Sequence, residues 1–140
     1  MIPAGSIRTL LAFALIALAC SSQPESEGAG WSAPSDSGRL IGVLGPESGE
    51  VRVNEFQTWI LALRTMDGTP VTGADLAITG GMPLHGHGLP TQPVASAELP
   101  GGRYRIEGMK LNMSGAWLIE VFVRTPAGQD RLRFDVAIDF

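Results

Sequence analysis

The sequence predicts an all-β fold, an immunoglobulin-like antiparallel β-sandwich of about seven strands. Three observations support this prediction. Short segments alternate apolar and polar residues, which is the period of a strand with one buried face. Glycine and proline turn signals separate these segments at intervals of roughly ten residues. No segment carries a capped apolar period of about 3.6 residues that is long enough for a helix.

The predicted strands follow one another from Arg39 to the end of the chain. The clearest is 132–140, where alternate residues from Leu132 to Phe140 are apolar, and 117–123 shows the same pattern. The segment 56–63 is apolar at nearly every later position, as expected for a central strand covered on both faces. Shorter candidates are 40–44, 74–79, 92–98 and 104–107. We therefore place the domain at 39–140, a length that suffices for one sandwich core.

Residues 1–19 have the layout of a secretory signal peptide. A positive charge at Arg8 precedes the apolar run LLAFALIALA, which at about ten residues is too short to span a bilayer as a helix. The run ends at Cys20, the only cysteine of the chain, and IALAC resembles a bacterial lipoprotein signal, although Ala17 stands where leucine is usual. We expect Cys20 to be lipidated; the alternative is an ordinary signal peptide followed by a free thiol. The residue after Cys20 is Ser21, whereas an aspartate at this position would resemble an inner-membrane retention signal. The outer membrane is therefore the expected location.

Residues 20–38 are predicted to form a flexible tether between the lipid and the domain. The segment is rich in Ser, Gly, Pro and Glu and contains one aromatic residue, Trp31. This composition buries too little apolar surface to offset chain entropy.

Composition excludes several classes of function. Removal of the signal peptide takes away Arg8 and leaves nine basic against fourteen acidic residues, a net charge of −5. A nucleic-acid partner is not expected, because phosphate neutralisation requires clustered Lys and Arg. There is no Ser-His-acid motif, paired-carboxylate signature or phosphate-binding loop, so we do not expect an enzyme.

The strongest chemical signal is GMPLHGHGLP, which contains both histidines of the chain, His85 and His87. Alternate residues of an extended segment point the same way, so both imidazoles can approach one ion, and Gly86 lets the backbone bend. Met82 adds a thioether, and imidazoles with a thioether favour copper, particularly Cu(I). The alternative is an ordinary turn whose histidines bond to backbone carbonyls.

A second methionine cluster, MKLNMSGAW, lies downstream. Met109 is expected to fill the core, as methionine at strand spacing usually does. For Met113, which precedes a Ser-Gly turn, core and site positions remain equally open.

Five short motifs resemble the FixH/YtkA-like family of small extracytoplasmic domains with an immunoglobulin-like β-sandwich. They are Asn54-x4-Trp59; Asp67-Gly-Thr-Pro-Val71 with Ala74; Met82-Pro-Leu-His85-Gly-His87-Gly; Gly102-Arg-Tyr104; and Met113-Ser-Gly-Ala-Trp117. The resemblance implies a link to copper, with membrane copper pumps or terminal oxidases as partners. It also implies the ligand set Met82, His85, His87 and Met113. FixH-type proteins usually have a transmembrane helix, whereas this chain has a lipoprotein-type signal, so the partner does not carry over directly.

Two hypotheses follow. In the first, the protein is a lipid-anchored copper carrier, chaperone or sensor that serves copper handling or oxidase assembly. In the second, it is a metal-free protein-interaction or assembly module of the cell envelope, in which the histidines only shape the turn.

Overall fold

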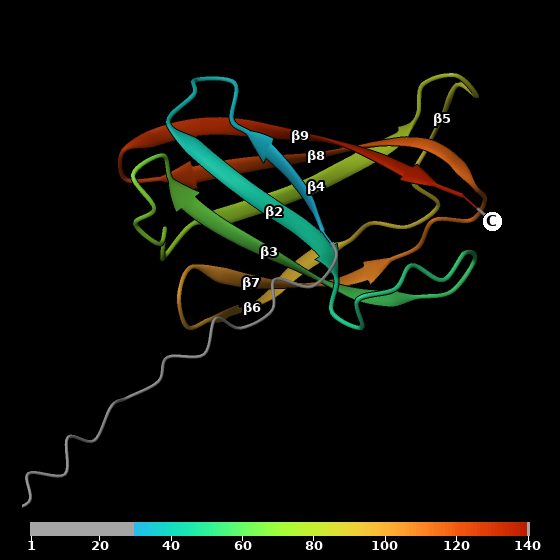
Figure 1. The fold of residues 1–140 in the computed structure, drawn as a ribbon, viewed down its shortest axis with the longest axis horizontal. Helices are drawn as coiled ribbons and strands as arrows, with labels where there is room; N and C mark the ends of the chain where they lie inside the picture. Colours follow the sequence, from blue (N-terminus) through green and yellow to red (C-terminus); the bar gives the residue numbers. More distant parts are fainter. Residues whose placement is uncertain (1–29, 140) are drawn as a thin grey trace, which may run out of the picture.

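The computed structural model describes residues 30–139 and shows two antiparallel sheets that form a sandwich (Figure 1). One sheet has five strands in the order β1-β2-β3-β7-β6, and the other has four in the order β5-β4-β8-β9. The five-stranded sheet comprises β1 (Trp31–Pro34), β2 (Leu40–Pro46), β3 (Gln57–Thr65), β7 (Arg103–Met109) and β6 (Val94–Leu99). The four-stranded sheet comprises β5 (His87–Gly88), β4 (Asp75–Met82), β8 (Gly115–Thr125) and β9 (Gly128–Ile138). The prediction of an all-β sandwich is confirmed.

The described residues contain nine strands, whereas the sequence predicted about seven. The seven predicted strands are all present, with ends that differ by a few residues. The two additional strands are β1 and β5, which contain only four and two residues. Strands this short show too few alternations to stand out in a sequence, so periodicity did not reveal them.

Strand β1 corrects the predicted domain boundary. Residues 31–34 were assigned to the tether, but they pair with β2 in a register that places Trp31 opposite Leu44. The ring of Trp31 stacks on Trp59, with centroids 5.7 Å apart and planes 9° apart. Ala33 is buried as well. The folded domain therefore includes residues 31–38, which the sequence analysis placed outside it. The predicted signal peptide, Cys20 and the rest of the tether lie outside the described residues.

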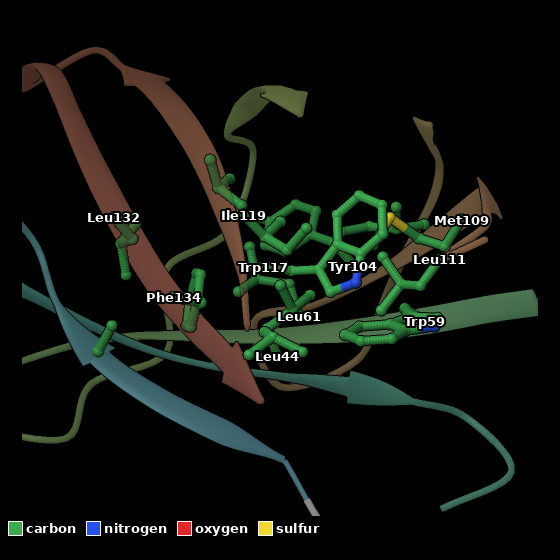
Figure 2. Packing of buried hydrophobic residues seen from close by; sticks show 14 of the residues in the cluster. Leu44, Trp59, Leu61, Tyr104, Met109, Leu111, Trp117, Ile119, Leu132 and Phe134 are labelled. Carbon is green, nitrogen blue, oxygen red and sulfur yellow. The ribbon is translucent and has the colours of Figure 1, made fainter. Parts of the chain in front are cut away.

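The core fills the space between the sheets, and both sheets contribute to it (Figure 2). Alternate residues of β8 and β9 face inward, as the sequence predicted, and are almost completely buried. Strand β3 differs from its prediction, because only one of its faces is fully buried. Ile60 and Ala62 on the other face are half-buried, since none of the described residues 30–139 forms a third layer over the five-stranded sheet. The buried residues of β3 are Gln57, Trp59, Leu61 and Leu63.

One end of the sandwich collects the loops that matter for the candidate site. The β4–β5 hairpin, the β7–β8 connection, the β2–β3 loop and the C-terminal end of β9 all lie at this end, on the right of Figure 1. The register explains the arrangement, because the last residues of β4 and the first residues of β8 pair with each other, with Gly81 opposite Leu118. Within residues 30–139, no helix is long and apolar enough to cross a membrane.

Candidate metal-binding site

The histidine-rich segment forms a tight hairpin between β4 and β5. Met82 pairs with His87, and residues 83–86 form the loop. The Met82 carbonyl accepts hydrogen bonds from the backbone N–H groups of His85 and Gly86, both at 3.0 Å. Pro83 occupies the position of the turn that favours its fixed φ, and Gly86 has a φ of +68°, which glycine adopts without strain. The sequence thus encodes a specific turn that presents both histidines.

Two glycines before the hairpin allow close packing of the backbones. A Cβ at Gly80 would lie 2.5 Å from the Leu118 carbonyl oxygen, and one at Gly81 would collide with the carbonyl of His87. The Gly80 carbonyl also accepts a hydrogen bond from the N–H of Leu89 at 2.9 Å. Gly80 therefore lets β4 pack closely against β8, and Gly81 lets β4 and β5 approach each other within the hairpin.

The structure brings the two histidines together on the exposed surface of the hairpin. The ring centroids of His85 and His87 are 5.9 Å apart, and the planes are inclined by 55°. Two imidazoles bound to one ion through bonds of about 2.0–2.1 Å have centroids about 5–6 Å apart, so this separation fits a shared ion. The sequence predicted that an extended segment would point both rings the same way. Gly86 instead has a left-handed backbone conformation, so a turn brings the two rings together.

Hydrogen bonding selects the tautomer of His87. Its Nδ1 lies 3.1 Å from the carbonyl oxygen of Gly88. A carbonyl only accepts, so Nδ1 carries the proton and Nε2 of the neutral ring keeps its lone pair. A backbone carbonyl is also a frequent partner for the second ring nitrogen of a metal-bound histidine. The bond agrees both with a metal ligand and with the alternative reading of a turn histidine bonded to a carbonyl.

Met82 lies in the core rather than on the exposed surface of the hairpin. Its side chain is 2% exposed, because Met82 continues the inward-facing positions of β4. The methyl group rests against Gly115, where a Cβ would be 2.6 Å from it. In this conformation the thioether of Met82 belongs to the hydrophobic core.

Met113 lies in the β7–β8 connection at the same end of the sandwich and is 37% exposed. Its carbonyl oxygen accepts a hydrogen bond of 3.0 Å from Nε1 of Trp117. The ring of Trp117 in turn contacts the ring of His87, with centroids 5.7 Å apart. One buried tryptophan thus links Met113 to the histidine hairpin. Met109 is 1% exposed and fills the core, as predicted.

A shallow pocket of about 190 Å³ lies beside the hairpin on the outer face of β4 and β8. His87, Gly81 and Glu120 are among the residues that line it, whereas His85 and Met113 are not. Glu120 was not predicted as a site residue from the sequence. Strand parity around Trp117 places Glu120 on the outer face, but only the pairing of Thr79 with Glu120 shows that it lies near the hairpin. Its carboxylate pairs with Arg131 at 3.3 Å.

The donor set narrows the choice of metal. Across residues 30–139, no three or more His, Cys, Asp and Glu side chains gather as a metal-binding group. The donors that the hairpin itself offers an ion are the two imidazoles, and a thioether would be a third donor. This combination fits Cu(I), whereas zinc normally recruits thiolate or carboxylate as well.

Fold and hairpin together define a class of protein, a small two-sheet β-sandwich domain that presents a histidine-containing hairpin at one end. The YtkA-like family model matches residues 43–122, which is more than half of the chain and runs from β2 into β8. The chain belongs to the YtkA-like family, and the resemblance drawn from its motifs is confirmed. Membership of this family suggests an extracytoplasmic domain. No curated protein and no solved structure matches the chain.

Proposed function

We propose that this protein is an extracytoplasmic Cu(I)-binding domain that holds the ion at the β4–β5 hairpin and passes it to a partner protein. The observation that carries the proposal is the pair of exposed imidazoles, His85 and His87, whose ring centroids are 5.9 Å apart. The backbone of the hairpin that presents this pair is held by its own turn hydrogen bonds.

The two methionines differ in what binding would require of them. Met113 is partly exposed, so its thioether could join the histidines without leaving the core. Met82 would first have to leave the core, and vacating such a site costs on the order of 2–5 kcal/mol, as buried Met-to-Ala changes do. Two imidazoles and one thioether leave copper with few ligands. An ion held in this way is open to exchange with the ligands of a partner.

A competition titration tests copper binding. The soluble chain 21–140 retains β1, whereas a chain that begins at residue 39 would lose it. This soluble form is titrated with Cu(I) against a chromophoric Cu(I) chelator, beside the double variant His85→Ala/His87→Ala. Both histidines are exposed, so the variant should remain folded. The proposal requires wild type to compete and the variant to lose most of this competition. Equal weak binding by both proteins would refute it.

We further propose that lipid on Cys20 anchors the domain to the cell envelope, with the outer membrane favoured. A copper pump or a copper-containing oxidase is the expected type of partner. The lipoprotein-type signal supports the anchor. Cys20→Ser should move the protein from the membrane fraction to the soluble fraction and abolish labelling by a radioactive fatty acid. A variant that remains in the membrane fraction would contradict the anchor.

Exposed apolar side chains favour a second candidate function, a protein-interaction module. Leu84 at the tip of the hairpin is 87% exposed and Phe56 in the β2–β3 loop is 68% exposed. Exposed apolar groups at one end of a domain are typical of contact surfaces when they form a continuous patch. A photo-crosslinker at position 84, with position 135 as an exposed control on β9, tests this function in intact cells. A position-84 adduct that forms equally without copper and without the two histidines would favour the metal-free module.

A further inference from the structure

We infer that Trp117 is a positioning residue of the proposed copper site, because it holds the histidine hairpin and the methionine turn in one arrangement before an ion arrives. The inference rests on the proposed function. It concerns a buried residue that would not itself touch the metal. Trp117 occupies an inward-facing position near the start of β8, is 1% exposed and lies among core residues of both sheets (Figure 2).

The indole N–H of Trp117 fixes the methionine turn. A buried indole N–H needs an acceptor, because leaving a buried donor unpaired costs about 1–3 kcal/mol. The acceptor is the carbonyl oxygen of Met113 at 3.0 Å. This bond restrains the orientation of the peptide that begins at Met113. Ser114 follows, and Gly115 is already the first residue of β8, so the bond ties the end of the β7–β8 connection to this strand.

The ring of the same tryptophan supports the hairpin. Trp117 and His87 meet in a T-shaped contact, with ring centroids 5.7 Å apart and planes at 72°. This is a favoured aromatic geometry, and it limits the rotation of the imidazole. A second restraint on the His87 ring is the hydrogen bond from its Nδ1 to the carbonyl oxygen of Gly88. The imidazole is therefore held by an aromatic contact and a hydrogen bond, while its Nε2 keeps the lone pair.

These two contacts link candidate donors from separate segments, the β4–β5 hairpin and the β7–β8 connection, which lie 26 residues apart in the sequence. A site built from separate segments binds an ion well only if a supporting residue fixes their relative position. Without Trp117, the hairpin would keep its own turn bonds, but the Met113 turn would lose its tie to β8. Trp117 therefore acts on how the site is assembled rather than on each donor alone.

The test uses Trp117→Phe, which retains an aromatic ring but removes the N–H donor. Trp59→Phe is the matched control. Trp59 is also 1% exposed, but it lies in the five-stranded sheet, where it stacks on Trp31 of the same sheet. The soluble chain 21–140 is titrated with Cu(I), and Ag(I) serves as a redox-silent probe. Trp117→Phe should weaken binding by about tenfold, as loss of outer partners of metal ligands does, and Trp59→Phe by less than about twofold.

A double-mutant cycle separates positioning from general destabilisation. Met113→Leu should weaken binding strongly in the wild-type background and much less in the Trp117→Phe background, because the turn is then already released. Additive losses in the cycle would overturn the inference, and so would equal losses from Trp117→Phe and Trp59→Phe.

A metal-free measurement distinguishes failure of this inference from failure of the proposed function. In the apo protein, backbone order parameters of residues 112–115 should fall from about 0.85 toward 0.6 in Trp117→Phe and stay unchanged in Trp59→Phe. If wild type binds no copper, the proposed function fails, and this measurement alone decides whether Trp117 positions the turn. Unchanged order parameters would then overturn the inference.

A wild-type measurement covers the case in which Trp117→Phe does not fold. The indole N–H resonance of Trp117 should shift when Ag(I) saturates the protein, while that of Trp59 should not. A Trp117 resonance that stays in place at saturation would overturn the inference.

Discussion

The thioether methyl of Met82 lies over the bare backbone of Gly115, where a Cβ carbon would be only 2.6 Å from it. The contact joins the last residue of β4 to the first residue of β8. Gly115 also has a φ of +125°, which residues with a side chain rarely adopt. The turn that carries Met113 thus depends on glycine for its backbone conformation and for the space that Met82 fills.

Gly115→Ala should destabilise the domain more than Gly128→Ala does. Gly128 has nearly the same φ, +126°, but its nearest contact for a Cβ is Arg39 at 4.0 Å. Both changes impose backbone strain of about 1–3 kcal/mol, and only Gly115→Ala adds the overpacking against Met82, about 1–3 kcal/mol more. Urea unfolding of both variants measures the difference. Equal losses of unfolding free energy in the two variants would show that the Met82 side chain moves aside without an energetic cost. Partial recovery of the stability of Gly115→Ala by Met82→Leu would support the contact.

Met113→Leu should lower the Cu(I) affinity by more than tenfold, because loss of an outer partner of a metal ligand already costs about 10- to 100-fold. Met82→Leu, with a similar volume, should change the affinity by less than about threefold, since Met82 is 2% exposed and packed in the core. Chelator competition on both variants measures this contrast. A larger effect of Met82→Leu would mean that the Met82 side chain leaves the core when copper binds.

The sequence identified the two histidines because they are the only ones and stand in a turn-rich segment. It did not distinguish the environments of the two methionines. Met82 ends a strand and so keeps its inward position, and Met113 lies beyond the end of β7, where that alternation stops. Glu120 could not be predicted as a neighbour of the hairpin, because its closeness to the hairpin follows from the pairing of β4 with β8. Such distant register is a tertiary property that local spacing does not encode.

Asp36→Asn should reduce stability near neutral pH and flatten its dependence on pH in the acid range. Asp36 bonds to Nε of Arg131 at 2.8 Å and to Arg133 at 2.9 Å, which ties the β1–β2 turn to β9. The hydrogen bond from Arg131 is the main reason why the pKa of Asp36 lies below its ordinary value. Because the folded-state pKa is the lower one, this stabilisation is complete above the unfolded pKa and is lost as the pH falls through the folded pKa.

Urea midpoints from pH 7 to pH 3 measure this effect. The gap between wild type and Asp36→Asn should be constant near neutral pH and should narrow in the acid range. Asp135→Asn, which removes an exposed carboxylate from the same strand β9, is the control and should leave the profile close to wild type. A gap that does not change with pH would exclude ionisation of Asp36 as the cause.

The seven longer strands could be predicted because their alternation is a local signal, whereas β1 could not. The residues around β1 are rich in Ser, Gly and Pro, and this composition led to the prediction of a tether. What orders the segment is its pairing with β2, together with a backbone bridge between Ser35 and Leu132 of β9. The energy comes from partners that are distant in the sequence, so the composition of the segment carries no sign of it.

Trp31→Ala should therefore destabilise the domain, although Trp31 was predicted to lie in a flexible segment. Its ring stacks on Trp59, and losing a half-buried aromatic side chain together with its stacking partner contact should cost about 1–3 kcal/mol. Ser32→Ala, an exposed change in the same strand, should stay within about 0.5 kcal/mol of wild type. Urea unfolding of the chain 21–140 measures both variants. If Trp31→Ala were as stable as Ser32→Ala, the stacking of Trp31 on Trp59 would contribute little to the stability of the fold.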